Sequence, residues 1–261
     1  VMVGAFALFV LACGLWCEGM RRAGPRAWTA WGVAIAVGVP VVYALRGDHP
    51  SVFTLAKTYS VLAGLVAVGC VRFGVLSGDT RWARGLFWFL LGGNILEAVV
   101  KEALGGAWSN PLAGLLLVAA IDPREPLRTA PGDTGVQWRL GWPWVLVYTA
   151  WNATFLYGVV SSSSPRAAWM PTTLLHLGLP LLLVRGRAER WFEYRVLALL
   201  FVMTWSPFAR GTRWTFWSTG IFSETVYTVA GVTTLLLAVA VLVRRWAFSA
   251  RMRGARELTD R

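Results

Sequence analysis

Charged residues are scarce in this chain of 261 residues. Only 15% of the residues are charged and 56% are hydrophobic, whereas a soluble domain carries roughly 25% charged residues. This composition excludes an ordinary soluble domain. It predicts an integral membrane protein.

Cysteines are also few, and their pattern excludes a disulfide framework. Cys13, Cys17 and Cys70 are an odd set inside apolar segments, without the spacing of paired cysteines. Cys13 and Cys17 share one helix face, but no His or Asp joins them, and a structural metal site needs four ligands. We interpret the cysteines as small apolar packing residues and expect no metal site.

Several catalytic motifs are missing. The chain has no Gly-rich phosphate loop, no His-Glu-x-x-His and no Gly-x-Ser-x-Gly. It also lacks an aspartate-rich cluster in its apolar segments, which diphosphate chemistry needs to hold Mg²⁺. Any enzyme activity is therefore expected to be metal-free and cofactor-free.

The basic residues are mostly arginines, and they give a formal net charge of +12. They punctuate apolar runs instead of clustering on one face or arm, so we expect no nucleic-acid partner. At helix ends they anchor orientation and meet anionic lipid headgroups. Val1 opens the first apolar run and Arg21 follows it, the reverse of a signal peptide, so this run is expected to remain as a helix.

Nine apolar runs predict an all-α, polytopic transmembrane bundle of about nine spans (seven to nine), in one domain covering residues 1–261. A helix needs about 20 residues to cross a bilayer, and the fifth run is short enough to be re-entrant. The expected spans are Val1–Cys17, Trp28–Leu45, Val52–Leu76, Gly85–Leu104, Pro111–Ile121, Leu140–Val160, Ala167–Val184, Trp191–Phe208 and Thr219–Val243.

Loop arginines favour the fifth run as a crossing, because most of them then lie on the inside. The prediction is N-terminus outside and C-terminus inside, in a bacterial plasma membrane. The longest polar stretch, Asp122–Arg139, reads as a Pro-Gly-Asp loop, and residues 251–261 as a short cytoplasmic tail.

Five polar residues lie inside apolar runs, where charge is costly and therefore suggests function. With a rise of about 1.5 Å per residue, they converge roughly 8 to 12 Å below the outer boundary. Boundary residues such as Glu18, Glu193 and Arg195 are interpreted instead as ion pairs or anchors. The five are Lys57, Glu97, Asn152, His176 and Glu224.

The fourth span carries the densest polar pattern. Asn94, Glu97 and Lys101 share one helix face, and a carboxyl there can act as a proton donor. The alternative is a structural ion pair of Glu97 with Lys57 or Lys101, since buried charges usually pair. Lys101 and Glu102 near the helix end are interpreted as snorkelling residues.

Tryptophan is abundant, with 16 in the chain. Many suit the membrane interface, but others fall within three different spans, and several aromatic residues share one of these spans with Asn152. Aromatic faces attract cations, so a cavity walled by them suits an apolar ligand that gains positive charge. Aromatic packing within the bundle is the alternative. The candidate binding residues are Trp88, Tyr148, Trp151, Asn152, Trp205, Lys57 and His176.

Several blocks resemble an uncharacterised family of bacterial integral membrane proteins. They are Lys57-Thr-Tyr-Ser60, Asn94-Ile-Leu-Glu-Ala-Val99, Trp151-Asn152 and Phe201-Val-Met-Thr204. A weaker similarity links the chain to small integral-membrane terpene cyclases, which pair an acidic helix segment with an acid in the last span. Those cyclases have seven helices, and their acid follows the Asn by four positions, not three.

The similarity to cyclases implies an isomerase- or lyase-type terpene cyclase of isoprenoid biosynthesis. Glu97 would protonate a prenylated or epoxyprenylated small molecule, with Glu224 and Asn94 completing the catalytic group. The partners would be this apolar molecule and membrane lipid. The alternative is a proton- or ion-coupled transporter or channel, with Lys57, Glu97, His176 and Glu224 as an intramembrane relay.

Overall fold

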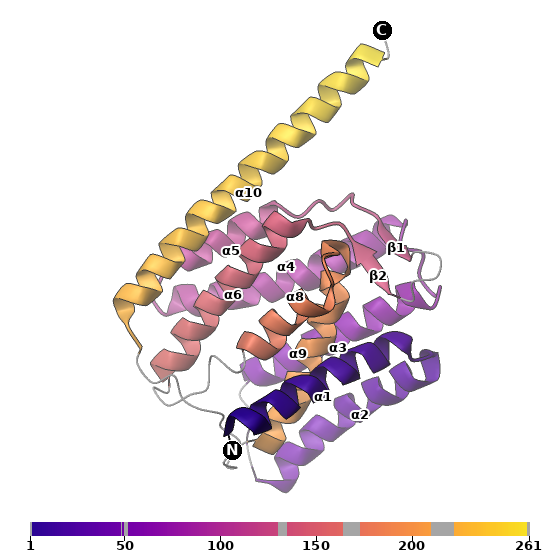
Figure 1. Ribbon diagram of the computed structural model, residues 1–261, viewed down its shortest axis with the longest axis vertical. Helices are drawn as coiled ribbons and strands as arrows, with labels where there is room; N and C mark the ends of the chain where they lie inside the picture. Colours follow the sequence, from indigo (N-terminus) through magenta and orange to yellow (C-terminus); the bar gives the residue numbers. More distant parts are fainter. Residues whose placement is uncertain are drawn as a thin grey trace.

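The described part of the chain is a bundle of helices with a small hairpin (Figure 1). A computed structural model describes residues 2–47, 49, 52–129, 135–163, 173–209 and 222–259. The prediction of an all-α fold is confirmed, and the apolar helices are compatible with a membrane protein. Among the described residues, four helices are long and apolar enough to cross a membrane: Pro25–Leu45, Thr54–Arg72, Arg81–Leu104 and Glu224–Ala247.

The first four helices follow the predicted spans closely. Local signals explain their ends: Pro25 takes a first-turn position, where its missing N–H is harmless, and the Thr80 side chain accepts a hydrogen bond from Ala83 N at 3.2 Å. Gly74 ends a turn with φ of 72°. The helices are α1 (Met2–Arg22), α2 (Pro25–Leu45), α3 (Val52–Arg72) and α4 (Arg81–Leu104).

The second half is less regular. A π-helical turn, η1 (Leu174–Gly178), runs into the short helix α8 (Leu179–Leu183), and a 3₁₀ turn, η2 (Ala188–Arg190), precedes α9. The seventh expected span is described only from Thr173 onward, and the described part includes the π-helical turn η1. The other elements are α5 (Ser109–Ala119), β1 (Leu127–Thr129), β2 (Val136–Trp138), α6 (Trp142–Ser163), α9 (Trp191–Ala209) and α10 (Glu224–Thr259).

Three differences from the expectations stand out. The loop after α5 contains an antiparallel hairpin, with Leu127 opposite Trp138. The expected tail is helical as far as Thr259, as a continuation of α10. The fifth run forms 11 residues of helix, which rise only about 16 Å against a hydrocarbon core of about 30 Å.

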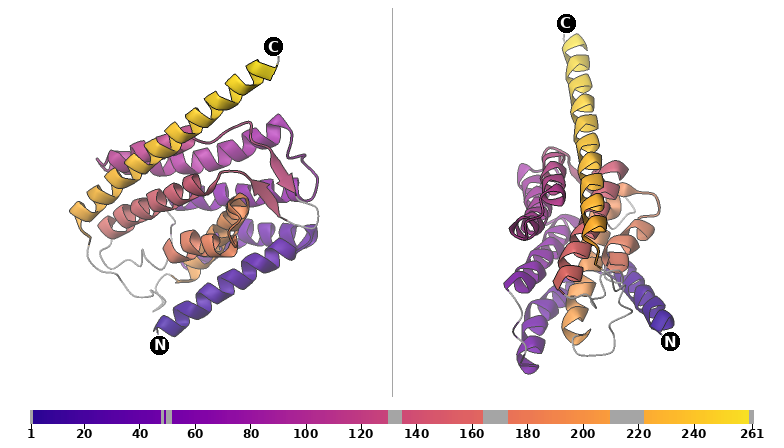
Figure 2. Two further views of the ribbon diagram at one scale, coloured as in Figure 1. Left: turned by 45° about the horizontal axis from the view of Figure 1, so that its top comes forward. Right: turned by 90° about the vertical axis from the view of Figure 1, so that its left-hand side faces the viewer.

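Helix α9 lies at the centre of the packing and contacts α1, α2, α3, α8 and β2. On the other side, α10 runs along α5 and α6 and extends past the bundle (Figures 1 and 2). The core is aromatic, with Trp144, Trp151 and Trp191 fully buried. Large apolar residues such as Leu15 and Leu236 face outward, as lipid-facing helices require.

Candidate functional site

Polar residues on two successive turns of α3 lie opposite polar residues of α4. Lys57 Nζ lies 3.2 Å from Glu97 Oε2 in an ion pair, and the two side chains are 12% and 23% exposed. One turn further, Ser60 and Asn94 line a small cavity. The structure thus confirms the pair of Glu97 with Lys57, which the sequence left as an alternative to a free acid.

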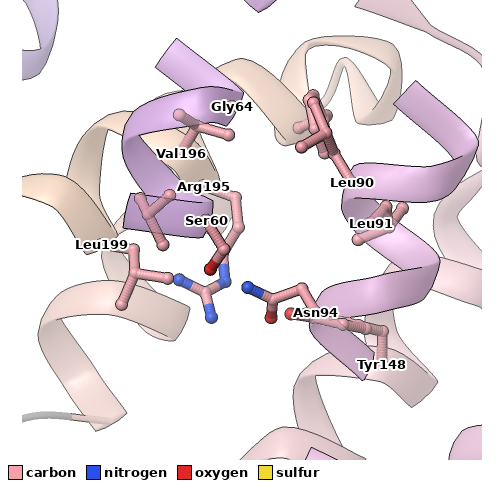
Figure 3. Close-up of a pocket in the computed structure, with 11 residues that line it drawn as sticks. Ser60, Gly64, Leu90, Leu91, Asn94, Tyr148, Arg195, Val196 and Leu199 are labelled. Carbon is pink, nitrogen blue, oxygen red and sulfur yellow. The ribbon is translucent and has the colours of Figure 1, made fainter. Parts of the chain in front are cut away.

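The same cavity receives Arg195 from α9. Ser60, Asn94, Tyr148 and Arg195 point toward one another around it (Figure 3). Arg195 was interpreted as a boundary anchor, and this is wrong: the residue is only 5% exposed and lies between helices. The cavity that Arg195 lines is formed by residues of α3, α4, α6 and α9, so its side chain lies among these helices.

Aromatic residues pack behind Tyr148. Its ring centroid lies 5.2 Å from Trp144, 5.7 Å from Trp151 and 4.9 Å from Trp191. Asn152 donates from Nδ2 to the Tyr148 hydroxyl at 3.1 Å, which holds the phenol at the cavity. Of the aromatic side chains predicted to bind ligand, Tyr148 lines this cavity, and Trp151 is a fully buried packing residue.

The remaining sequence candidates lie apart from this cluster. Trp88 is half-buried, and Trp205 is half-buried beside Phe9, with ring centroids 5.2 Å apart. His176 is 3% exposed in the π-helical turn η1, which packs on α9 and α6. Neither tryptophan nor His176 lines the described pockets.

A larger pocket lies where α4 ends and α10 begins. It has a volume of about 610 Å³ and is lined by both polar and apolar groups. Glu102 and Glu224 contribute carboxyls, and Trp108, Phe222 and Tyr227 contribute aromatic rings. We call it the Glu102 pocket. Glu224 is exposed at its rim, whereas Glu97 does not line it.

Glu102 is the most constrained side chain of this pocket. It is 4% exposed, so its interpretation as a snorkelling residue is wrong. Asn110 Nδ2 lies 3.0 and 2.9 Å from its two oxygens, and the Tyr227 hydroxyl makes a short hydrogen bond to Oε1. Thr234 donates to Asn110 Oδ1 at 3.1 Å and fixes the amide. A carboxyl held by three helices thus faces a large pocket.

The turn between α4 and α5 explains this arrangement. Gly106 adopts a φ of 86°, which favours glycine, and the chain reverses within four residues. The last turn of α4 therefore meets the first turn of α5. A Gly-Gly pair between Glu102 and Asn110 was the signal in the sequence that would have brought these two residues together.

A third polar cluster lies at the opposite end of the bundle. Glu193 is fully buried, and its carboxylate lies 3.5 Å from Arg21 Nε and 3.8 Å from Arg72 Nη1. It also accepts a hydrogen bond from Val136 N at 2.9 Å. We call this group the Glu193 network. It ties α1, α3, α9 and β2 together, so the interpretation of Glu193 as a membrane-boundary anchor is also wrong.

Comparisons with known proteins add no assignment. A scan of protein-family models, a search of curated proteins and a search of solved structures each find no match to this chain. Within the part of the chain that the structure describes, no three His, Cys, Asp or Glu side chains are grouped to hold a metal ion.

Proposed function

We propose that this chain is a membrane-embedded enzyme, a terpene cyclase that protonates a prenylated or epoxyprenylated small molecule in the Glu102 pocket. The observation that carries the proposal is the buried Glu102 carboxyl on the wall of a pocket of about 610 Å³. A pocket of this size is in the range of small-molecule sites. The setting would be a bacterial plasma membrane, where an apolar substrate dissolves.

The proposed chemistry assigns the acid to Glu102 in place of Glu97. Glu97 is occupied by Lys57 and faces neither pocket. The Glu102 carboxylic acid gives its proton to an alkene or epoxide, and a carbocation forms. The rings of Trp108, Phe222 and Tyr227 border the same space, and aromatic faces stabilise cations.

Glu224 completes the cycle as the base. It lies on the same pocket wall as Tyr227 and accepts the final proton from the cyclised cation. One proton enters and one leaves, so the product is an isomer of the substrate. The exposed Glu224 then releases this proton to water, and the Tyr227 hydroxyl takes a proton from water as it gives its own to Glu102, so all three groups return to their starting states. Asn110 keeps the carboxyl oriented throughout.

The test is conversion of farnesylated or epoxyfarnesylated acceptors by the purified full chain without added metal. Mass spectrometry and NMR should detect a cyclised isomer. Glu102→Gln should lower turnover by roughly 10²-fold or more, the usual contribution of a general acid, while folding persists. Glu189→Gln is the control, because Glu189 lies in η2, outside this pocket. Wild-type turnover in Glu102→Gln, or no conversion by the wild type, would reject the proposal.

A second candidate is ion-coupled transport, which the Lys57–Glu97 pair favours. Charges within spanning helices commonly mark ion or proton pathways. Flux of protons or ions in liposomes that needs Glu97 and tolerates Glu102→Gln would support this function. Isoprenoid conversion that needs Glu102 and tolerates Glu97→Gln would support the cyclase.

A further inference from the structure

Arg195 carries a charge that its protein surroundings leave uncompensated. The side chain is 5% exposed, and within the described residues its Nε and Nη1 are buried without a hydrogen-bond partner. Its centre lies 6.0 Å from the Tyr148 ring centroid, at the limit of a cation–π contact. An arginine does not lose its proton in a protein, so burial cannot be relieved by neutralisation.

Among the described residues, the neighbouring acids do not supply the missing charge. Glu97 is paired with Lys57, and Glu193, two residues before Arg195, is paired with Arg21 and Arg72. The group of Lys57, Glu97 and Arg195 therefore keeps one net positive charge. An unpaired buried charge is strongly unfavourable, so a compensating group is expected beside the guanidinium.

The cavity beside Arg195 has the donors that an anion needs. Asn94 directs its amide toward the guanidinium (Figure 3). The Tyr148 hydroxyl accepts from Asn152 and so keeps its own proton free to donate. Ser60 already donates to Lys57 O at 3.0 Å. The donors are thus Arg195, Asn94 and Tyr148, from three different helices.

Volume limits the size of the ligand. The cavity measures about 40 Å³, whereas one water needs roughly 10–15 Å³. The space therefore suits an ion of halide size with little water. We propose that Asn94, Tyr148 and Arg195, in the cavity that Ser60 also lines, bind a small monovalent anion, with Arg195 as its counter-charge. The site is independent of the proposed cyclase chemistry in the Glu102 pocket.

The test compares the melting temperature (Tm) of the purified full chain in bromide and in gluconate at equal ionic strength. Unfolding is monitored by tryptophan fluorescence. A ligand that binds only the folded state stabilises it by mass action, so bromide should raise Tm by about 3 °C or more. Gluconate is too large for the cavity. Bromide in a crystal would also give anomalous density beside Arg195.

Two variants test whether the rise in Tm comes from bromide bound beside Arg195. Asn94→Asp places a carboxylate of the same shape beside Arg195, so it should raise Tm in gluconate and abolish the bromide response. Arg195→Gln should also abolish the response. Arg22→Gln is the control, because that side chain is 78% exposed, and it should respond as the wild type does. No bromide effect in the wild type, or an equal effect in Asn94→Asp, would overturn the site; the latter result would mean an adventitious ion only.

Discussion

The two ends of the bundle both bury a glutamate, yet they treat it differently. At one end, Glu193 is surrounded by two arginines and a backbone N–H, and Gly135 packs so closely against it that no space remains for a Cβ. At the other end, Glu102 is held by Asn110 and Tyr227 but faces an open pocket. Burial alone therefore does not distinguish the two carboxyls. They differ in access to a pocket, and the proposed function depends on that difference.

The first way to break this comparison is to remove the charge of Glu193. Glu193→Gln leaves Arg21 and Arg72 buried without their shared counter-ion, and breaking a buried pair costs about 3–5 kcal/mol. We expect a large fall in Tm and in the yield of folded protein extracted in detergent. Glu102→Gln should fold, because Glu102 is held by Asn110 and Tyr227 and its loss leaves no buried arginine without a counter-ion. Equal losses in both variants would erase the distinction between the two ends.

Gly135→Ala tests how tightly the Glu193 network is closed. A Cβ at this position would lie 2.6 Å from Arg21 Nη2 and closer still to Glu193 Oε2. Overpacking of this kind costs about 1–3 kcal/mol, seen as a lower Tm. Gly38→Ala in α2 is the matched control, since nothing lies within 4 Å of its Cβ position. An unchanged Tm in Gly135→Ala would show that the Glu193 network rearranges at little energetic cost.

The Lys57–Glu97 pair lies between the two ends and is only partly buried. Glu97→Gln and Lys57→Met should each lower the free energy of unfolding, and the double variant should recover part of the loss. For contacting residues such interaction energies are about 0.5–3 kcal/mol. Thermal or denaturant unfolding of the wild type, the two single variants and the double variant measures this interaction energy. Additive losses would mean that the pair contributes no stability and leave Glu97 free for a chemical role.

The sequence predicted the first four helices well, because apolar runs end at clear stops such as Gly24-Pro25 and Gly105-Gly106. It missed the hairpin, since strands of three residues are shorter than an alternating pattern can reveal. It brought Lys57 and Glu97 together through charge pairing. It missed the burial of Arg195 and Glu102, because both lie within five residues of a helix end, and burial there depends on which distant segments cover that end.

The smallest effect is expected at Glu18, at the margin of the Glu193 network. The Tyr194 hydroxyl donates to Glu18 Oε1 at 2.5 Å and accepts from Arg21 Nη1 at 2.7 Å. Glu18→Gln keeps an oxygen acceptor for Tyr194 and loses only the 3.9 Å pair with the exposed Arg22. Exposed pairs contribute about 0–1 kcal/mol, so Tm should change by no more than a degree or two. Tyr194→Phe removes the hydroxyl that joins Glu18 to Arg21 and should cost more than Glu18→Gln. A loss at Glu18 as large as at Glu193 would extend the network to the surface and show that charge, not burial, defines its boundary.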